Sequence, residues 1–147
     1  MASGELHEMV AKRLERVGQR YTAGRRALVE VLAGSDQPLT IQQVLDAEPS
    51  TPQSSAYRNI AVLEQAHAVN RIVTSDDFAR FELAQDLTEH HHHLICTTCG
   101  GVTDFTLPAA FEDELGKRLG RASRGHDFES ADHRLDVIGT CSRCASD

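Results

Sequence analysis

The sequence contains no long apolar segment and no cysteine before residue 96. Its uninterrupted apolar runs extend over only a few residues, so neither a transmembrane helix nor a membrane partner is expected. The first ten residues include no apolar stretch of the kind that a secretory signal requires, which predicts a cytoplasmic location. Proline and glycine together make up 14 of the 147 residues, which excludes collagen-like and low-complexity chains. The length suits one domain, or two small ones that share a core.

Basic residues are in the minority and are unevenly placed along the chain. The net charge is −7, yet residues 12–26 contain six basic side chains and one acidic side chain. Residues 86–147 contain six basic and eleven acidic side chains. This asymmetry favours an anion contact near the N-terminus and a cation-binding region near the C-terminus. A solvated helix face would give the same basic stretch, so charge alone leaves both interpretations open.

The four cysteines form two Cys-x2-Cys pairs with 41 residues between them. They are Cys96, Cys99, Cys141 and Cys144. A reducing compartment keeps such thiols free, so this pattern indicates a metal site rather than disulfides. Four thiolates with this spacing can close tetrahedrally on one Zn²⁺ ion, which makes the site structural. A thiol–disulfide redox pair is the alternative, but no thioredoxin-like βαβ pattern surrounds the cysteines.

The N-terminal half shows helical periodicity followed by two short β-like runs. The predicted elements are helices over 5–16, from Thr22 to Gly34, from Thr40 to before Pro49, and from Ser54 or Ser55 to about Ala66, then strands over 70–74 and 78–83 around Ser75-Asp76-Asp77. Two helices joined by a tight turn within 40–66 have the size of a helix-turn-helix. The hairpin that follows would be its wing. The sequence therefore predicts a winged helix over 1–83.

The pattern changes after a polar linker at 84–90. Strands are predicted over 91–96, 102–105 and 135–139, with one helix that starts at Pro108. The apolar face of that helix would consist of Phe111, Leu115 and Leu119. The predicted fold class is thus α+β, with an N-terminal winged helix-turn-helix domain and an α/β domain over 91–147.

Four consecutive histidines, His90 to His93, precede the first cysteine pair. Successive side chains of a strand point to opposite faces, so alternate histidines share a face and two separate metal sites can form. The further candidate ligands are Glu82, Asp104, Glu112, Asp113 and His133. Imidazole and carboxylate suit Zn²⁺, Fe²⁺, Mn²⁺, Co²⁺ or Ni²⁺ alike, and a polar surface strand without metal is the alternative. Because imidazole binds metal only when neutral, binding is expected to fail below about pH 6.5.

The predicted second helix of the helix-turn-helix begins with a polar cluster. Its members are Gln53, Ser54, Ser55, Tyr57, Arg58 and Asn59. This end of the helix meets base edges when such a motif docks on DNA. Arg58 can contact guanine or phosphate, and Tyr57 can contact a thymine methyl group or a phosphate. Polar residues at a helix start are common, so the cluster alone does not establish DNA binding.

Taken in order, these motifs resemble the ferric uptake regulator (Fur) superfamily of bacterial metal-responsive repressors. The resemblance is carried by Gly18-Gln19-Arg20-Tyr21-Thr22 with Arg26, by Ser54-Ser55-Ala56-Tyr57-Arg58-Asn59, by His90-His91-His92-His93-Leu94-Ile95-Cys96 with Cys99 and Gly100, and by Gly139-Thr140-Cys141 with Cys144. It implies a winged-helix domain joined by a hinge to an α/β dimerisation domain. It also implies homodimers that bind an AT-rich inverted repeat of double-stranded DNA when loaded with metal.

The resemblance assigns roles residue by residue. It implies a structural zinc site at Cys96, Cys99, Cys141 and Cys144, a regulatory site for a second divalent metal at Glu82, His91, His93 and Asp104, and an additional site at His90, His92, Glu112 and His133. It further implies that Arg20 lies near the minor groove and that Tyr57 and Arg58 enter the major groove.

Two features depart from the patterns of the family. Iron- and peroxide-sensing members usually supply a histidine from the winged-helix domain, and Gln37 occupies that place here. Zinc-sensing members often have a cysteine shortly before the histidine run, which this chain lacks. The Gln37 replacement, with the histidine run and the second cysteine pair, favours Zn²⁺ as the sensed metal over Fe²⁺, Mn²⁺ or a peroxide response.

The predicted function is a metal-dependent DNA-binding repressor of metal uptake or homeostasis genes, and not an enzyme. A catalytic metal would need an open coordination position and a separate general acid or base, and would leave the wing and the helix-turn-helix unexplained. A metal-storage or delivery protein is a further alternative, which predicts metal binding without DNA affinity.

Overall fold

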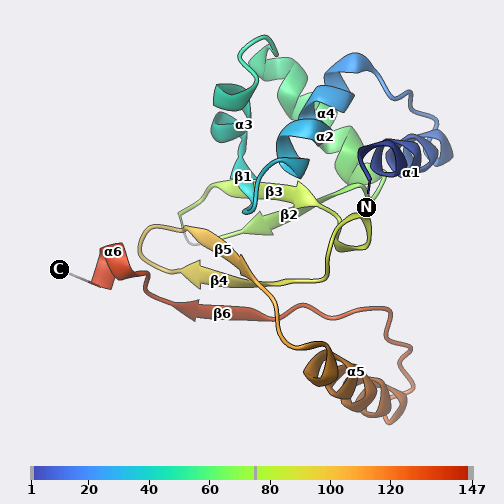
Figure 1. The fold of residues 1–147 in the computed structure, drawn as a ribbon, viewed down its shortest axis with the longest axis vertical. Coiled ribbons are helices and arrows are strands. Elements are labelled where there is room, and N and C mark those ends of the chain that lie inside the picture. Colours follow the sequence, from blue (N-terminus) through green and yellow to red (C-terminus); the bar gives the residue numbers. More distant parts are fainter. Residues whose placement is uncertain (1, 75, 146–147) are drawn as a thin grey trace.

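The computed structural model describes residues 2–74 and 76–145, and its N-terminal half is a winged helix-turn-helix (Figure 1). Its elements are α1 (Ser3–Arg16), α2 (Ala23–Ala33), β1 (Leu39–Thr40), α3 (Ile41–Ala47), α4 (Gln53–Gln65), β2 (Val69–Val73) and β3 (Ala79–Leu83). The strands form an antiparallel sheet in the order β1-β3-β2. The hairpin turn was predicted at Ser75-Asp76-Asp77, of which Ser75 lies outside the described residues.

Side-chain capping explains where α2 and α3 begin. Thr22 accepts a hydrogen bond from the backbone N–H of Arg25 and begins α2. Thr40 forms a reciprocal capping box with Gln43 at the start of α3. The fourth helix begins at Gln53, one residue before the predicted Ser54, because the carbonyl of Pro52 already accepts the N–H of Ala56. Strand β1 was not predicted, since two residues are too few to show a pattern.

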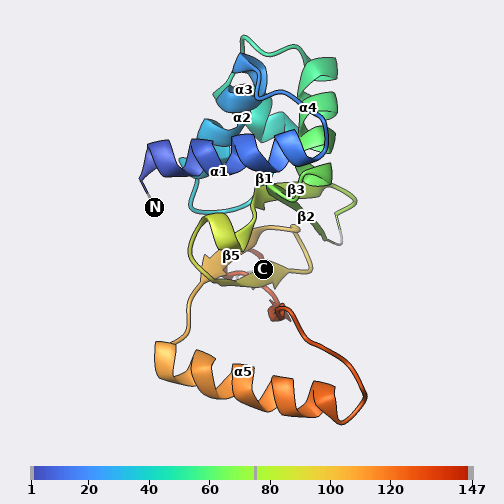
Figure 2. The same cartoon turned by 90° about the vertical axis from the view of Figure 1, so that its right-hand side faces the viewer.

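The buried core of this half lies between the helices and the sheet. Leu28 and Leu32 of α2, Ile60 and Leu63 of α4 and Phe81 of β3 are all at most 5% exposed. Figure 2 shows α1 to α4 stacked on one side of this sheet and the second sheet on the other. The core therefore fixes the position of β3, and with it the candidate metal ligand Glu82 near the end of that strand.

The segment 84–90 contains more structure than a polar linker. Ala84 and Leu87 are buried in the core of the winged helix, and residues Gln85–Leu87 form a short 3-10 helix. Asp86 accepts two hydrogen bonds from the guanidinium group of Arg13 on α1, at 2.6 and 3.2 Å. The Gln85 side chain donates to the backbone carbonyl of His91 at 2.8 Å. The domain limits 1–83, 84–90 and 91–147 stay a prediction.

The C-terminal half consists of a second sheet and an outlying helix. Its elements are β4 (His92–Cys96), β5 (Val102–Phe105), α5 (Ala109–Arg124), β6 (Asp136–Gly139) and α6 (Ser142–Ala145). The strand order is β5-β4-β6, with β5 antiparallel and β6 parallel to β4. Figures 1 and 2 both place α5 at the end of the molecule opposite the winged helix.

Helix α5 has the predicted apolar face, but no part of the described chain covers it. Phe111 and Leu119 are 52% and 38% exposed, and α5 has no buried residue. Phe128, after the helix, is also exposed at 64%. No helix in the described part of the chain is long and apolar enough to cross a bilayer.

Candidate metal centres and DNA-contact surface

The fold brings the candidate ligands into three compact groups. In each group, one possible ligand atom per residue lies within 4.8 Å of the others. The groups are a cysteine cluster (Cys96, Cys99, Cys141 and Cys144), a hinge cluster (Glu82, His91, His93 and Asp104) and a helix cluster (His90, His92, Glu112 and His133). These are the same three sets that the resemblance implied. Their grouping is a structural observation, whereas their metal-binding roles stay predictions.

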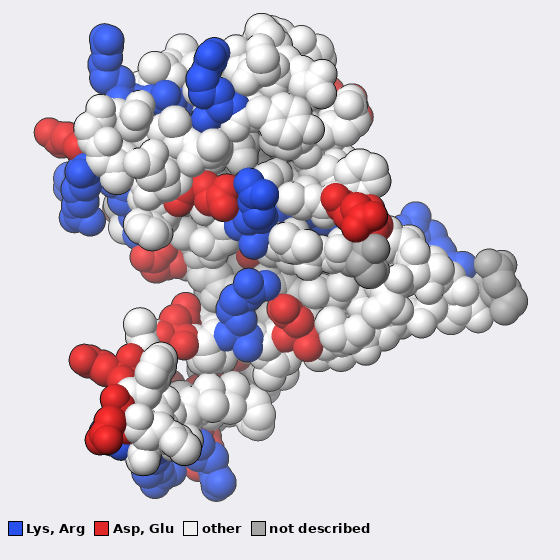
Figure 3. All heavy atoms as spheres, turned by 180° about the vertical axis from the view of Figure 1, so that it is seen from behind, with Lys and Arg blue, Asp and Glu red and all other residues white. Residues whose placement is uncertain are grey.

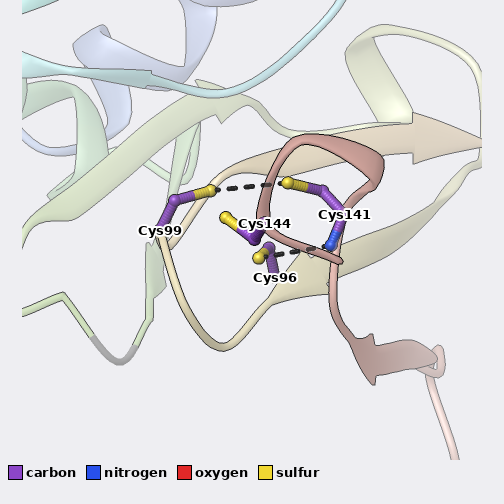
Figure 4. A group of neighbouring side chains, drawn as sticks. All are labelled: Cys96, Cys99, Cys141 and Cys144. Carbon is purple, nitrogen blue, oxygen red and sulfur yellow. Dashed lines mark hydrogen bonds between the residues drawn. The ribbon is translucent and has the colours of Figure 1, made fainter. Parts of the chain in front are cut away.

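The cysteine cluster is built by the parallel pair β4 and β6. Cys96 is the last residue of β4 and pairs with Gly139, the last residue of β6. Each strand therefore delivers a Cys-x2-Cys turn to the same place, and Figure 4 shows the sulfur atoms converging there. The Sγ atoms of Cys99 and Cys141 are 3.9 Å apart.

Backbone N–H groups stabilise the thiolate form of Cys96, whereas the hydrogen bond with Cys141 raises the pKa of the Cys144 thiol to about 12. The N–H of Cys141 donates to Sγ of Cys96, and the N–H of Gly101 donates to Sγ of Cys99, both at 3.4 Å. Such bonds, the one from Cys141 foremost, lower the pKa of the Cys96 thiol to about 6. Thiolate is the form that binds Zn²⁺. The donor set therefore fits a closed four-sulfur zinc site.

The wing lies directly against the turn that contains Cys96 and Cys99. Gly100 has a φ of +73°, which favours glycine, and a side-chain carbon there would overlap the carboxylate of Asp76 on the wing. Asp76 is itself fixed by Arg80, whose Nη2 lies 2.8 Å from its Oδ2. The winged helix therefore approaches the turn after Cys99 at a second place besides the hinge cluster.

The hinge cluster joins the two halves of the molecule. Glu82 comes from β3 of the winged helix and is 7% exposed. Its two carboxylate oxygens lie 2.9 Å from Nε2 of His91 and 2.9 Å from Nε2 of His93. Asp104 of β5 faces the same two nitrogens at 3.6 and 3.5 Å. Two imidazoles and two carboxylates thus surround one point, which fits a divalent cation.

A cavity lined by residues of both halves opens onto the hinge cluster. It has a volume of about 360 Å³ and is lined by Glu82, His91 and Asp104 together with Ser35 and Gln37 from the loop after α2. Gln37 thus lies beside the site, as the resemblance implied.

The hinge cluster holds protons tightly in the absence of metal. Burial opposes the charged form of both histidines. The backbone carbonyl of Glu89 and then Glu82 outweigh it for His91, and Glu82 outweighs it for His93, so the pKa of each is raised above 6.5. Burial would raise the pKa of Glu82, yet the hydrogen bonds from His93 and His91 lower it. Metal must therefore displace protons that are bound more firmly than those of free imidazole.

We accordingly expect the metal affinity of the hinge cluster to begin falling above pH 6.5 as the pH is lowered. Below its raised pKa each histidine is mostly protonated, which stabilises the metal-free form of the cluster. This stabilisation of the metal-free form is lost as the pH rises through that pKa. Zinc dissociation constants measured by chelator competition between about pH 6 and pH 8 would check this. An affinity that stays constant down to pH 6.5 would contradict it.

The helix cluster lies on the opposite face of β4. Nε2 of His92 is 2.5 Å from Oε1 of Glu112, and the other oxygen of Glu112 faces His90 and His133 at 3.3 and 3.5 Å. The Nε2 atoms of His90 and His133 and Oε2 of Glu112 are buried without a hydrogen-bond partner. Buried polar atoms aimed at one point fit a bound cation. The alternation along the strand predicted this separation of the four histidines.

The residues predicted to contact DNA lie on the outer surface of the winged helix. Arg20, Ser54, Tyr57 and Arg58 are exposed, with Tyr57 at 55%, and Ser55 is partly buried. Figure 3 shows Lys and Arg side chains projecting from this end of the molecule. The surface is thus available to an anionic partner.

Two half-buried members of the basic stretch are held by contacts within the protein, and the exposed Arg26 also lies 3.6 Å from Glu30. Arg13 binds Asp86, as described above, and Arg25 donates to the carbonyl of Arg20 at 2.7 Å and to the side chain of Asn59 at 3.2 Å. Arg25 therefore links the loop of Arg20 to helix α4. Charge counting could not separate these two arginines from the exposed ones.

Sequence reasoning missed one residue at the hinge cluster. Asp136 lies opposite His93 in the β4–β6 pair, and its Oδ1 is 3.3 Å from Nδ1 of His93. No spacing motif identifies it, because its position beside His93 depends on the register of a strand that begins 43 residues later in the sequence.

Comparisons of the sequence with a family model, of the sequence with known proteins and of the fold with solved structures all point to the same family. Residues 16–138 match the model of the Ferric uptake regulator family. The chain is 32% identical to the Peroxide-responsive repressor PerR of Staphylococcus aureus (strain USA300) over 144 residues. This alignment covers 95% of the chain and 91% of that protein. It resembles the Helicobacter pylori ferric uptake regulator Fur with a TM-score of 0.74 and 23% identity, over 99% of this chain and 95% of that one. It also resembles a zinc-bound manganese uptake regulator with a TM-score of 0.61 and 28% identity, over 92% and 98% of the two chains.

Proposed function

The chain belongs to the ferric uptake regulator family of metal-dependent regulators, and from this premise we propose that it is a DNA-binding repressor of metal uptake or homeostasis genes. In this proposal it acts in the cytoplasm as a metal-loaded homodimer on AT-rich inverted repeats. Its role is regulatory and not enzymatic.

The observation that carries the proposal is the composition of the hinge cluster. Glu82 belongs to the winged helix, whereas His91, His93 and Asp104 belong to the following segment and the second sheet. A divalent cation held by all four would supply the positive charge that draws both carboxylates and both imidazoles together. Binding would therefore favour one angle between the halves and raise the population of the DNA-competent dimer.

Zn²⁺ is the sensed metal that we favour, with Fe²⁺, Mn²⁺ or a peroxide response as the alternatives. Gln37 stands where iron- and peroxide-sensing members usually supply a histidine, so the site offers four imidazole and carboxylate ligands without it. Such a set suits tetrahedral Zn²⁺, although the same donors also suit the other two ions. The relatives include a peroxide-responsive repressor and a manganese uptake regulator.

The other sites have supporting roles in the proposal. The cysteine cluster holds a structural Zn²⁺, and the helix cluster is an additional metal site. The exposed apolar face of α5 suits contact with a second copy of the chain. Arg20, Ser54, Ser55, Tyr57 and Arg58 form the DNA contacts.

The proposal predicts that purified protein binds an AT-rich palindrome far more tightly with metal than after chelation. Fluorescence anisotropy with Zn²⁺, Fe²⁺ or Mn²⁺ in turn would measure this and rank the metals. A storage or delivery protein would bind the metals and show no affinity for DNA.

Two arginine variants would serve as controls for that experiment. Arg58→Ala should weaken binding to the palindrome by about 1–3 kcal/mol if the side chain meets a base. Arg20→Ala should weaken binding to all sequences and reduce the salt slope by roughly 1. Unchanged operator affinity of Arg58→Ala would show that α4 is not the recognition helix.

A further inference from the structure

The first residue of β6 lies beside one of the hinge histidines. Strand β6 runs parallel to β4, and Asp136 is the Cα partner of His93. The backbone N–H of His93 donates to the carbonyl of Leu135 at 3.3 Å, so the two segments are tied together at this point. The Asp136 carboxylate then reaches Nδ1 of the imidazole at 3.3 Å.

The two nitrogens of His93 face different carboxylates. Nε2 faces Glu82 at 2.9 Å and Asp104 at 3.5 Å, and these belong to the hinge cluster. Nδ1, on the other side of the ring, faces Asp136. An imidazole can bind a metal through one nitrogen only if its remaining proton is held by the other. His93 is 3% exposed, so water has little access to its ring.

From this geometry we propose that Asp136 is a positioning residue of the hinge cluster: it holds the proton of His93 on Nδ1 and leaves Nε2 free for the sensed cation. The inference rests on the proposed function, since it assumes that the hinge cluster binds metal. Asp136 itself is not a ligand in this arrangement, because it lies on the side of the ring away from the other three residues.

His91 provides an internal comparison. Its Nε2 also faces Glu82, and its Nδ1 lies 2.8 Å from the backbone carbonyl of Glu89. Both histidines are therefore oriented in the same way, one by a main-chain oxygen and one by a carboxylate. A charged partner on Nδ1 also makes Nε2 a stronger donor to metal. Only the partner of His93 can be removed by substitution.

The test compares Asp136→Ala and Asp136→Asn with the wild type in the full-length protein that retains its cysteine-bound zinc. Asp136→Ala removes both the acceptor and the charge, so the affinity of the hinge cluster for Zn²⁺ should fall about 10–100-fold in a chelator competition. Asparagine keeps an oxygen acceptor without the charge, so its loss should be smaller. Glu129→Gln, an exposed change in the segment before β6, is the matched control and should bind like the wild type.

A second measurement separates positioning from general damage. In metal-free protein above the raised pKa of His93, the ¹⁵N chemical shifts should report a proton on Nδ1 in the wild type and in Asp136→Asn, and a changed tautomer population in Asp136→Ala. Wild-type affinity and an unchanged tautomer in Asp136→Ala would overturn the inference. A wild type that binds no Zn²⁺ beyond the cysteine cluster would instead refute the proposed function.

Discussion

Replacing His91 by alanine is expected to abolish metal-dependent DNA binding and to leave a folded dimer with its cysteine-bound zinc. His91 supplies one of the four ligands of the hinge cluster, and its ring lies 2.9 Å from Glu82 on the winged helix. Without it, the cation loses a donor at the place where the two halves meet. The cysteine cluster lies at the other end of β4 and should keep its metal.

The matched control for this prediction is His92→Ala. His92 is on the opposite face of β4 and contacts Glu112 of α5, so its loss should shift the metal response only partly. Metal titrations of operator binding for both variants provide the comparison. A normal response of His91→Ala together with an unresponsive His92→Ala would reverse the assignment of the two faces.

The second large effect is expected from Cys96→Ser or Cys141→Ser. Each variant should lose one zinc per chain and should no longer form a folded dimer. The reason lies in the small core of the C-terminal half. Among the described residues after 91, the buried apolar side chains are Ile95, Cys96 and Val102. A structural zinc site can contribute roughly 10–16 kcal/mol of apparent binding energy, far more than three such side chains.

Metal analysis, size-exclusion chromatography and thermal melting would check this prediction. Ser142→Ala is a suitable control, because Ser142 is exposed and lies within the same turn as Cys141. It should retain zinc, dimer and melting temperature. A cysteine variant that stays dimeric with an unchanged melting curve would show that the cysteine cluster is dispensable for folding.

Several elements were predictable because they depend on short-range rules. Thr22 and Thr40 begin helices because their hydroxyl groups accept nearby N–H groups, and this depends on a few neighbouring residues. The separation of the histidines onto two faces follows from the alternation of a strand, although β4 itself begins only at His92. The cysteine spacing similarly indicated a cluster that the fold then assembles.

Other features depend on contacts between distant segments and were not predictable. Asp136 reaches His93 only through the register of β6 on β4. Arg13 and Arg25 belong to the basic stretch that was predicted to contact an anion. In the structure Arg13 binds Asp86, and Arg25 binds Asn59 and a backbone carbonyl. The apolar face of α5 was predicted correctly, yet nothing in the pattern could show that the described chain leaves it uncovered.

The position of β6 after all four hinge ligands in the sequence has a consequence for newly made protein. The four residues of the hinge cluster have all been synthesised once Asp104 is added, whereas Asp136 and the second cysteine pair follow later. Synthesis of the segment from Asp104 to Cys144, about 40 residues, requires roughly 2–8 s at about 5–20 residues per second. On our proposals, a nascent or prematurely terminated chain would thus carry all the sensing ligands without the strand that orients His93. Full affinity of the hinge cluster for metal would then arise only after β6 has been added and has paired with β4.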